Sequence, residues 1–466
     1  MFETLKNAFK VKDIRRKILI TIFLLIVFRL GCWLPIPGLN PSFYLSGFFK
    51  DDGARGNTLL DLLGAITGGA LSHGAFLSLG ISPYINASII FQLLTVAIPP
   101  LERLSKQGEE GRRKLNQITR IGTLVLALAQ SVGVAINWAN EGNIADIFGF
   151  GVDNVTASNW VVGIFVVIIL VTGAMFTMWL GEKITELGIG NGISLIIFVG
   201  IIATAGQGLV YTMFYKFIPI IKGPASSEPI QFGDPTSLMA LWELLGFLAM
   251  VLFIFIFIIW VDLAERRINI QYAKQVKGRK LYGGQSTHIP IKVNANGVLP
   301  IIFASALTSF PMVIMGMIPN AKDSGFGIWY ERFLSPNGKD NYVYMVVTAL
   351  LIFLFSFFYA QIQFKPDEVS RNIQQYGGFI PGIRPGRPTT EYLAKISKRL
   401  TFFGAFFLAF LALVPSVVFR AALGPGSALI NAFSATGLLI VVSIALELEK
   451  QLEGQLMMKH YKGFLK

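Results

Sequence analysis

The sequence has few charged side chains for its length. Of its 466 residues, 40 are Lys or Arg and 27 are Asp or Glu, which together make 14% of the chain. Soluble globular chains carry about 25% charged residues. Apolar residues reach 53%, which is more than one soluble core can bury, and a chain of such high hydrophobicity is not disordered. The composition therefore predicts an integral membrane protein.

Cysteine and histidine are almost absent. The single cysteine, Cys32, excludes an intrachain disulfide and a cysteine-based metal site. The three histidines are too scattered for a histidine-rich metal centre or a proton relay, and we interpret them as loop or surface residues: His73, His288 and His460. We expect neither a metal ion nor a cofactor.

Motifs for nucleotide binding and hydrolysis are also missing. The Gly338-Lys339 pair is followed by Asp340, so it is not part of a Walker motif. The sequence contains neither the HExxH pattern of zinc proteases nor the GxSxG pattern of serine hydrolases. We therefore predict that the chain is not an enzyme and has no catalytic residues.

Long uncharged stretches predict the membrane spans, because crossing the hydrocarbon takes about 20 mostly apolar residues. Nine stretches lack charged residues and histidine. A tenth contains Arg29 near its end, where a long side chain can reach the membrane interface. We predict an all-α polytopic protein with ten transmembrane helices, within residues 18–34, 74–101, 121–140, 154–181, 187–215, 244–261, 293–321, 341–364, 400–419 and 421–446.

The basic residues lie mostly on one side of these spans. With the N-terminus in the cytosol, the cytosolic segments hold 30 Lys and Arg residues and the outer segments hold eight. Cytosolic loops of membrane proteins are enriched in Lys and Arg. The formal charge of +13 then divides into about +15 on the cytosolic side and −3 outside, and the remaining +1 comes from Arg29, Arg120 and Glu243 within or at the edge of the spans. Both termini are predicted to be cytosolic.

Ten spans divide into two halves of five, residues 1–215 and 216–466, which enter the membrane from opposite sides. An odd number of spans in each half is typical of an inverted-topology repeat. The second predicted span contains Gly80-x-x-Pro83-x-x-x-Ala87-Ser88, and the seventh contains Gly297-x-x-Pro300-x-x-x-Ala304-Ser305. Shared ancestry of the halves explains the identical spacing. The alternative is that these residue types simply recur in membrane helices.

One apolar segment, residues 59–72, is too short to cross the membrane, and its glycines weaken it as a helix. A re-entrant half-helix is permitted in this place only where protein or water encloses it. The alternative is an amphipathic loop on the outer side.

Two predicted cytosolic loops, residues 262–292 and 365–399, are long and basic. In the first, Ile268, Ile270 and Tyr272 alternate with polar residues, which indicates a strand. The second contains the segment FIPGIRPGRP (379–388), a rigid turn that should hold Arg384 and Arg387 outward. Topology alone accounts for the sign of the charge. A docking surface for an acidic partner also accounts for the length and pattern of the loops.

A secondary solute carrier built on inverted repeats is the main alternative function. Ion-coupled carriers place ionisable groups inside their helix bundles. Most predicted helix interiors here carry only amides and hydroxyls, such as Asn86, Gln92, Asn191 and Gln207. This pattern argues against a proton- or sodium-driven carrier.

Several long motifs resemble the bacterial SecY family, the channel-forming subunits of the general protein-secretion translocon. They occur in order over essentially the whole chain: GGALS (68–72), GISPYINASIIFQLL (80–94), GEKITELGIGNGISLIIF (181–198), QSTHIPIKVN (285–294), GVLPIIFAS (297–305) and FIPGIRPGRPTTEYL (379–393). The resemblance implies a passive protein-conducting channel. Such a channel translocates secretory polypeptides and releases membrane segments sideways between the second and seventh helices.

The resemblance also assigns site residues. A ring of aliphatic side chains that seals the pore is expected at Ile81, Ile85, Ile193, Ile197, Ile302 and Ile440. The short segment corresponds to the plug, with Leu62, Leu63, Gly64, Ile66, Gly68 and Gly69. The lateral gate is expected to contain Pro83, Asn86, Ser88, Gln92, Pro300, Ser305 and Thr308. Docking of a motor or ribosome is expected at Arg266, Arg267, Lys274, Lys277, Arg279, Lys280, Arg384 and Arg387.

The partners and the location follow from the resemblance as well. It implies the small subunits SecE and SecG, the SecA motor ATPase, and the ribosome through its RNA and proteins. The substrates would be signal peptides and unfolded polypeptides, and the chain would lie among the lipids of the bacterial plasma (inner) membrane.

Overall fold

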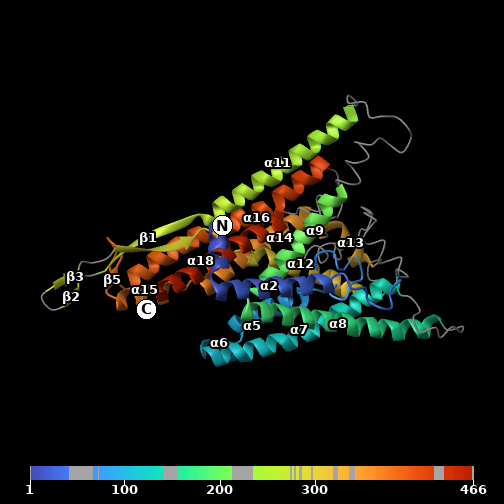
Figure 1. The fold of residues 1–466 in the computed structure, drawn as a ribbon, viewed down its shortest axis with the longest axis horizontal. Helices are drawn as coiled ribbons and strands as arrows, with labels where there is room; N and C mark the ends of the chain where they lie inside the picture. Colours follow the sequence, from blue (N-terminus) through green and yellow to red (C-terminus); the bar gives the residue numbers. More distant parts are fainter. Residues whose placement is uncertain are drawn as a thin grey trace. The chain divides into compact units, whose positions relative to one another are not determined.

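The structure is a computed structural model. It describes residues 2–40, 67–71, 73–140, 144, 155–212, 235–272, 275–277, 280–282, 286–294, 297–317, 324–334, 342–423 and 435–463. Most of the described residues are helical (Figure 1). The helices are α1 (Phe2–Lys10), α2 (Lys12–Gly31), α5 (Ser82–Ala97), α6 (Pro99–Lys106), α7 (Glu109–Asn140), α8 (Val155–Leu187), α9 (Gly192–Thr212), α11 (Pro235–Leu263), α12 (Leu299–Met317), α13 (Gly325–Phe333), α14 (Tyr342–Gln363), α15 (Pro366–Gln375), α16 (Arg387–Leu423) and α18 (Ala435–Gly463).

Each of the ten predicted stretches contains part of at least one of these helices. Among the described residues, four helices are long and apolar enough to cross a membrane, or up to five when a bent pair counts as one span. The fold class of an all-α polytopic membrane protein is thus supported. The number of ten spans stays a prediction.

The second predicted span differs from a simple helix. Residues 74–80 form turns, and α5 begins only at Ser82. Gly74 and Gly80 have φ of 60° and 50°, a conformation that ends regular helix and that glycine adopts readily. At the other end, α5 stops at Ala97 and α6 continues after a bend of 105°. Pro99 and Pro100 follow that bend, where they can only begin a new helix.

The described chain forms two compact units. The first contains Met1–Glu243, Ala306–Asn341 and Arg420–Lys466, and the second contains Leu244–Ser305 and Tyr342–Phe419. In the first unit, α7 packs against both α5 and α8, and α9 packs against α8 and α18.

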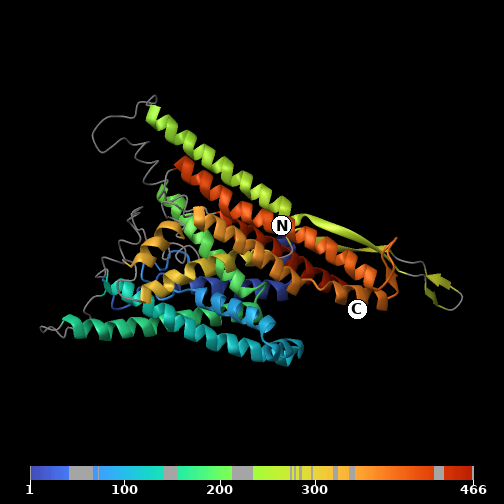
Figure 2. The ribbon, with the colours of Figure 1, turned by 180° about the vertical axis from the view of Figure 1, so that it is seen from behind.

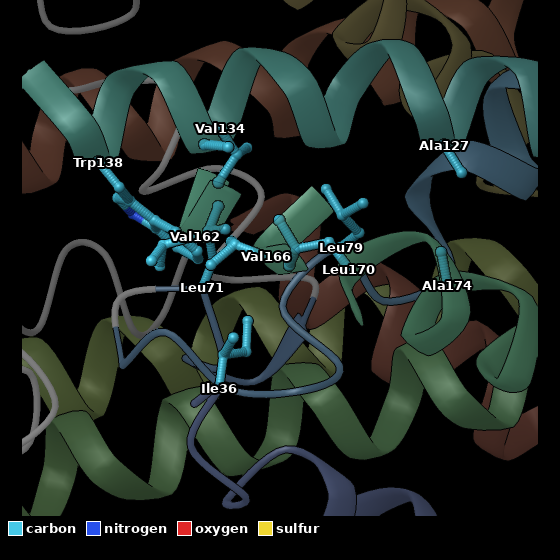
Figure 3. Close-up of a cluster of buried hydrophobic side chains, with 11 residues drawn as sticks. Ile36, Leu71, Leu79, Ala127, Val134, Trp138, Val162, Val166, Leu170 and Ala174 are labelled. Atoms are coloured by element: carbon cyan, nitrogen blue, oxygen red, sulfur yellow. The ribbon is translucent and has the colours of Figure 1, made fainter. Parts of the chain in front are cut away.

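A buried cluster lies at the centre of the contact between α7 and α8 (Figure 3). Val162, Val166 and Leu170 occur at every fourth residue of α8, so they share one face of that helix, and all three are fully buried. Trp138 from α7 packs on them, and Ile36 and Leu71 reach the cluster from segments outside the helices. This cluster fixes the segment around Leu71 against the helices.

Two glycines of α8 give a matched test of this packing. A Cβ at Gly173 would overlap the carbonyl oxygen of Phe76, whereas a Cβ at Gly163 has open space around it. We expect Gly173→Ala to destabilise the fold by about 1–3 kcal/mol, the usual result of overpacking against backbone. Gly163→Ala should leave the thermal unfolding midpoint of the detergent-purified chain unchanged or slightly raised. Equal midpoints for the two variants would contradict the close approach.

The second unit carries a small antiparallel sheet in the order β4–β1–β5. Its strands are β1 (Glu265–Tyr272), β4 (Ser286–Lys292) and β5 (Gly378–Phe379), and a separate pair is formed by β2 (Gln275–Lys277) and β3 (Lys280–Tyr282). In Figures 1 and 2, β1 runs on from the end of α11, and β2 and β3 lie at its far end. The strand predicted from alternation is confirmed, since Ile268 and Ile270 are buried.

Candidate functional site

The repeated glycine–proline motif has the same local structure at both of its positions. Gly80 and Gly297 have φ of 50° and 61°, and a helix begins two residues after each of them. Proline is the second residue of each helix, where its missing N–H costs no hydrogen bond. The alanine four residues later is fully buried in both helices: Pro83 and Ala87 in α5, and Pro300 and Ala304 in α12. The two motifs are therefore alike in conformation as well as in sequence.

Five of the six predicted pore-ring isoleucines lie in the first unit. Ile81, at the start of α5, is 2% exposed, and Ile85 one turn later is half-buried. On α9, Ile193 is half-buried and Ile197 is buried. Because α9 packs against α18, the helix that carries Ile440 lies beside the helix that carries Ile193 and Ile197. The sixth residue, Ile302, is half-buried on the part of α12 in the second unit.

The predicted lateral-gate residues lie on α5 and α12. On α5, Pro83 is buried, Asn86 and Ser88 are half-buried, and the Gln92 Nε2 donates to the Ser88 Oγ at 3.4 Å. On α12, Pro300 and Thr308 are buried, and the Ser305 Oγ donates to the Ile301 carbonyl at 2.9 Å. Gln92 and Ser305 thus satisfy part of their hydrogen bonding within their own helices.

The predicted plug is described only at its carboxyl end. Gly68 and Gly69 lie in a turn with φ of 71° and 85°. Leu62, Leu63, Gly64 and Ile66 lie outside the described residues.

Arg29 contacts this turn, which the sequence did not indicate. Its Nη1 donates to the Gly68 carbonyl oxygen at 3.0 Å. The acceptor lies within the same unit, and the expectation that the side chain reaches the membrane interface stays a prediction.

An ion pair between α7 and α8 was also not predicted. The Arg120 guanidinium on α7 binds the Glu182 carboxylate on α8 through two parallel hydrogen bonds of 2.8 Å each. Such bidentate pairs are among the stronger hydrogen-bonded contacts in proteins. The pair joins residues 62 positions apart in sequence, so only the packing of α7 on α8 reveals it.

The basic residues predicted for docking fall on the second unit. Arg266 and Arg267 are exposed on β1, and the Arg267 Nε donates to Glu265 at 2.7 Å. Arg387 begins α16 and pairs with Glu391 at 3.3 Å. Lys277 and Lys280 belong to β2 and β3, while Lys274 and Arg279 lie outside the described residues.

A small buried core supports the turn that carries Arg384. Ile380 packs with Ile268, Ile270, Ile373 and Leu393, all of them buried. The Arg384 side chain is exposed and forms no ion pair with any residue that the structure describes.

Two side-chain hydrogen bonds fix the backbone of the same turn. The buried Thr389 Oγ1 donates to the Arg384 carbonyl at 2.9 Å, and the Ser370 Oγ donates to the Gly386 carbonyl at 3.0 Å. The predicted turn is present in the structure. The Arg384 side chain on this turn is exposed and is not ion-paired with a described residue.

Comparison with known proteins decides the family. The family model described as SecY matches residues 75–448. The chain belongs to the SecY family. It is 40% identical to the protein translocase subunit SecY of Halalkalibacterium halodurans, over the full length of both chains. It is 38% identical to that of Corynebacterium glutamicum, with 99% of each chain covered.

Solved structures show the same fold. A protein-conducting channel matches with a TM-score of 0.60 at 18% identity, over 94% of this chain and 91% of that one. A SecY structure in which the plug domain stabilises the closed channel matches with a TM-score of 0.58, also at 18% identity and with the same coverage. Canine Sec61 in a ribosome–channel complex has a TM-score of 0.52 at 16% identity, over 94% of this chain and 91% of that one.

This SecY-family chain is therefore a multi-pass membrane protein whose relatives are protein translocase subunits, and it has the fold of a protein-conducting channel. Its family consists of translocase subunits rather than enzymes, in line with the sequence-based prediction. The solute-carrier alternative is not supported.

Proposed function

We propose that this SecY-family chain forms a gated pore in the bacterial plasma membrane, with both termini in the cytosol and with two inverted halves, residues 1–215 and 216–466. The match to SecY over the whole chain carries this proposal. The shared local structure of the Gly80 and Gly297 motifs supports the repeat, because unrelated helices need not begin in the same way. The excess of Lys and Arg on one set of loops supports the orientation.

The proposed pore is sealed at its waist by the six predicted isoleucines. Their side chains carry no charge and no hydrogen-bonding group, so an ion that enters among them loses hydration without replacement. A passing polypeptide meets only deformable apolar side chains. The burial of Ile81, Ile197 and Ile440, each at most 8% exposed, supports positions inside a helix bundle rather than toward lipid.

We propose that the chain supplies no energy of its own and that partners drive translocation. The exposed arginines of β1 and of the Arg384 turn form a basic surface suited to an acidic protein face or to RNA phosphate. The SecA motor ATPase and the ribosome are the proposed partners at this surface. The ribosome-bound canine Sec61 is a channel of the same fold. SecE and SecG are the proposed companion subunits.

Photo-crosslinking tests the path of the substrate. A photoreactive amino acid is placed at Ile85 or Ile197 in secretion-competent membrane vesicles, and a precursor is stalled during translocation. Both positions should label the precursor. The matched control is Ile164, an isoleucine of α8 that is 58% exposed and should label lipid instead. Labelling of the precursor from Ile164 but from neither of the other positions would contradict the proposed pore.

A further inference from the structure

Arg29 is the one charged residue between Ile18 and Gly31, the apolar part of α2. A charged side chain within a membrane helix costs several kcal/mol unless it is paired, so it is retained where it has a function. Its neighbours on the helix are apolar, and Leu30 is 59% exposed. In a membrane helix the exposed apolar side faces lipid, so the guanidinium needs partners within the protein.

One hydrogen-bond partner of Arg29 is a backbone carbonyl 39 residues away. The Nη1 donates to the Gly68 oxygen at 3.0 Å, and the guanidinium carbon lies 6.0 Å from the centre of the Trp33 ring. The first contact is a charge-assisted hydrogen bond, which is about twice as strong as a neutral one. The second is a cation–π contact at the limit of its range. Arg29 thereby connects α2 to the turn at the end of residues 59–72.

This turn leaves no space for a side chain. A Cβ at Gly68 would overlap the Arg29 Nη1 and would lie 3.3 Å from the backbone of Gly200 on α9. A Cβ at Gly69 would lie 3.0 Å from the Gln207 Oε1, also on α9. Both glycines have positive φ, which other residues adopt only with strain. The Gly68-Gly69 turn is therefore held between α2 on one side and α9 on the other.

We propose that Arg29 is a positioning residue that holds the Gly68-Gly69 turn in place and so sets how readily the channel opens. This inference rests on the proposed function of a gated pore, together with the prediction that residues 59–72 form its plug. The turn joins that segment to the cluster around Leu71, and it lies on α9, the helix that also carries Ile193 and Ile197. Movement of the Gly68-Gly69 turn away from α2 requires the Arg29–Gly68 hydrogen bond to break. Its strength therefore adds to the free energy of opening.

The experiment measures the resting ion conductance of the intact translocon in lipid bilayers, normalised to the amount of folded channel. Arg29→Leu removes both the charge and the donor, and it should raise the resting conductance about tenfold or more, the change expected from one lost charge-assisted hydrogen bond. Arg29→Lys keeps a charged donor and should raise it much less. Gly68→Ala should also raise it, because the new Cβ displaces the guanidinium.

Coupling between the two residues separates this role from general destabilisation. The effects of Arg29→Leu and Gly68→Ala on the free energy of opening should not add, because either change breaks the same contact. Gly108→Ala is the matched control. Gly108 has a φ of 73° but nothing within 4 Å of a Cβ, so its backbone strain alone should leave the conductance unchanged.

Each outcome decides the proposal. Parental conductance in folded Arg29→Leu channels overturns it, as does full additivity with Gly68→Ala. Should Arg29→Leu fail to accumulate, Arg29→Lys and Gly68→Ala carry the test, and parental conductance in Gly68→Ala then overturns it. Pore-ring variants measured in parallel distinguish a failure of this inference from a failure of the proposed pore. Leaky ring variants with silent Arg29 variants refute this inference alone, whereas silence of both refutes the proposed pore.

Discussion

Arg384→Glu is expected to abolish motor-driven secretion while leaving the chain folded and abundant. The side chain is exposed and makes no ion pair with a described residue, so its replacement removes no contact within the protein. The turn keeps its shape through the Thr389 and Ser370 hydrogen bonds, which use backbone carbonyls only. Reversal of the charge places a carboxylate against an acidic partner, which costs several kcal/mol at a docked surface. Partner affinity should fall about a hundredfold or more.

The measurement is the ATP-dependent import of a precursor into inverted membrane vesicles with added SecA, with the amount of channel determined in the same vesicles. Arg112→Glu on α7 is the matched control, because Arg112 is another exposed arginine on the predicted cytosolic side but lies outside the docking set. It should leave import near the parental level. Import that is unchanged in Arg384→Glu would refute the docking surface. Equal loss in both variants would show a general need for cytosolic charge instead.

The features that the sequence predicted are those set by neighbouring residues. The alternation of Ile268, Ile270 and Tyr272 with polar residues predicted a strand with one buried face, and the structure contains this strand as β1. Uncharged stretches predicted membrane helices, because the apolar character of a helix can be read from its own residues. The family motifs placed the candidate site residues, since their order and spacing are retained along the whole chain.

The features that the sequence missed depend on packing between distant segments. Arg29 bonds to Gly68, and Arg120 bonds to Glu182. No local pattern pairs residues 39 or 62 positions apart. Apolarity also failed to locate the start of α5, because hydropathy reports burial and not conformation. The turns before Ser82 are as apolar as the helix that follows, and only the positive φ of Gly74 and Gly80 separates them.

Replacement of the pore-ring isoleucines is expected to raise the resting ion leak of the channel. An ion among isoleucine side chains loses its water shell and gains no ligand, whereas serine hydroxyls hydrogen-bond water and serine leaves space for it. The design begins with Ile85 and Ile193, because both are half-buried and their truncation costs less stability than that of Ile81 or Ile197. The double variant Ile85→Ser/Ile193→Ser should conduct about tenfold or more above the parent, which corresponds to a barrier lowered by about 1.4 kcal/mol or more.

The matched control is Ile164→Ser/Ile168→Ser, since both isoleucines of α8 are 58% exposed and lie on its apolar outer surface. This pair makes the same chemical change away from the proposed pore and should leave the conductance at the parental level. A leak in both double variants would indicate loosened packing rather than a broken seal. Parental conductance in a folded Ile85→Ser/Ile193→Ser channel would contradict the sealing role. Addition of Ile81→Ser should raise the leak further, because Ile81 is one helical turn from Ile85 and the removal of both leaves a continuous polar path along that face of α5.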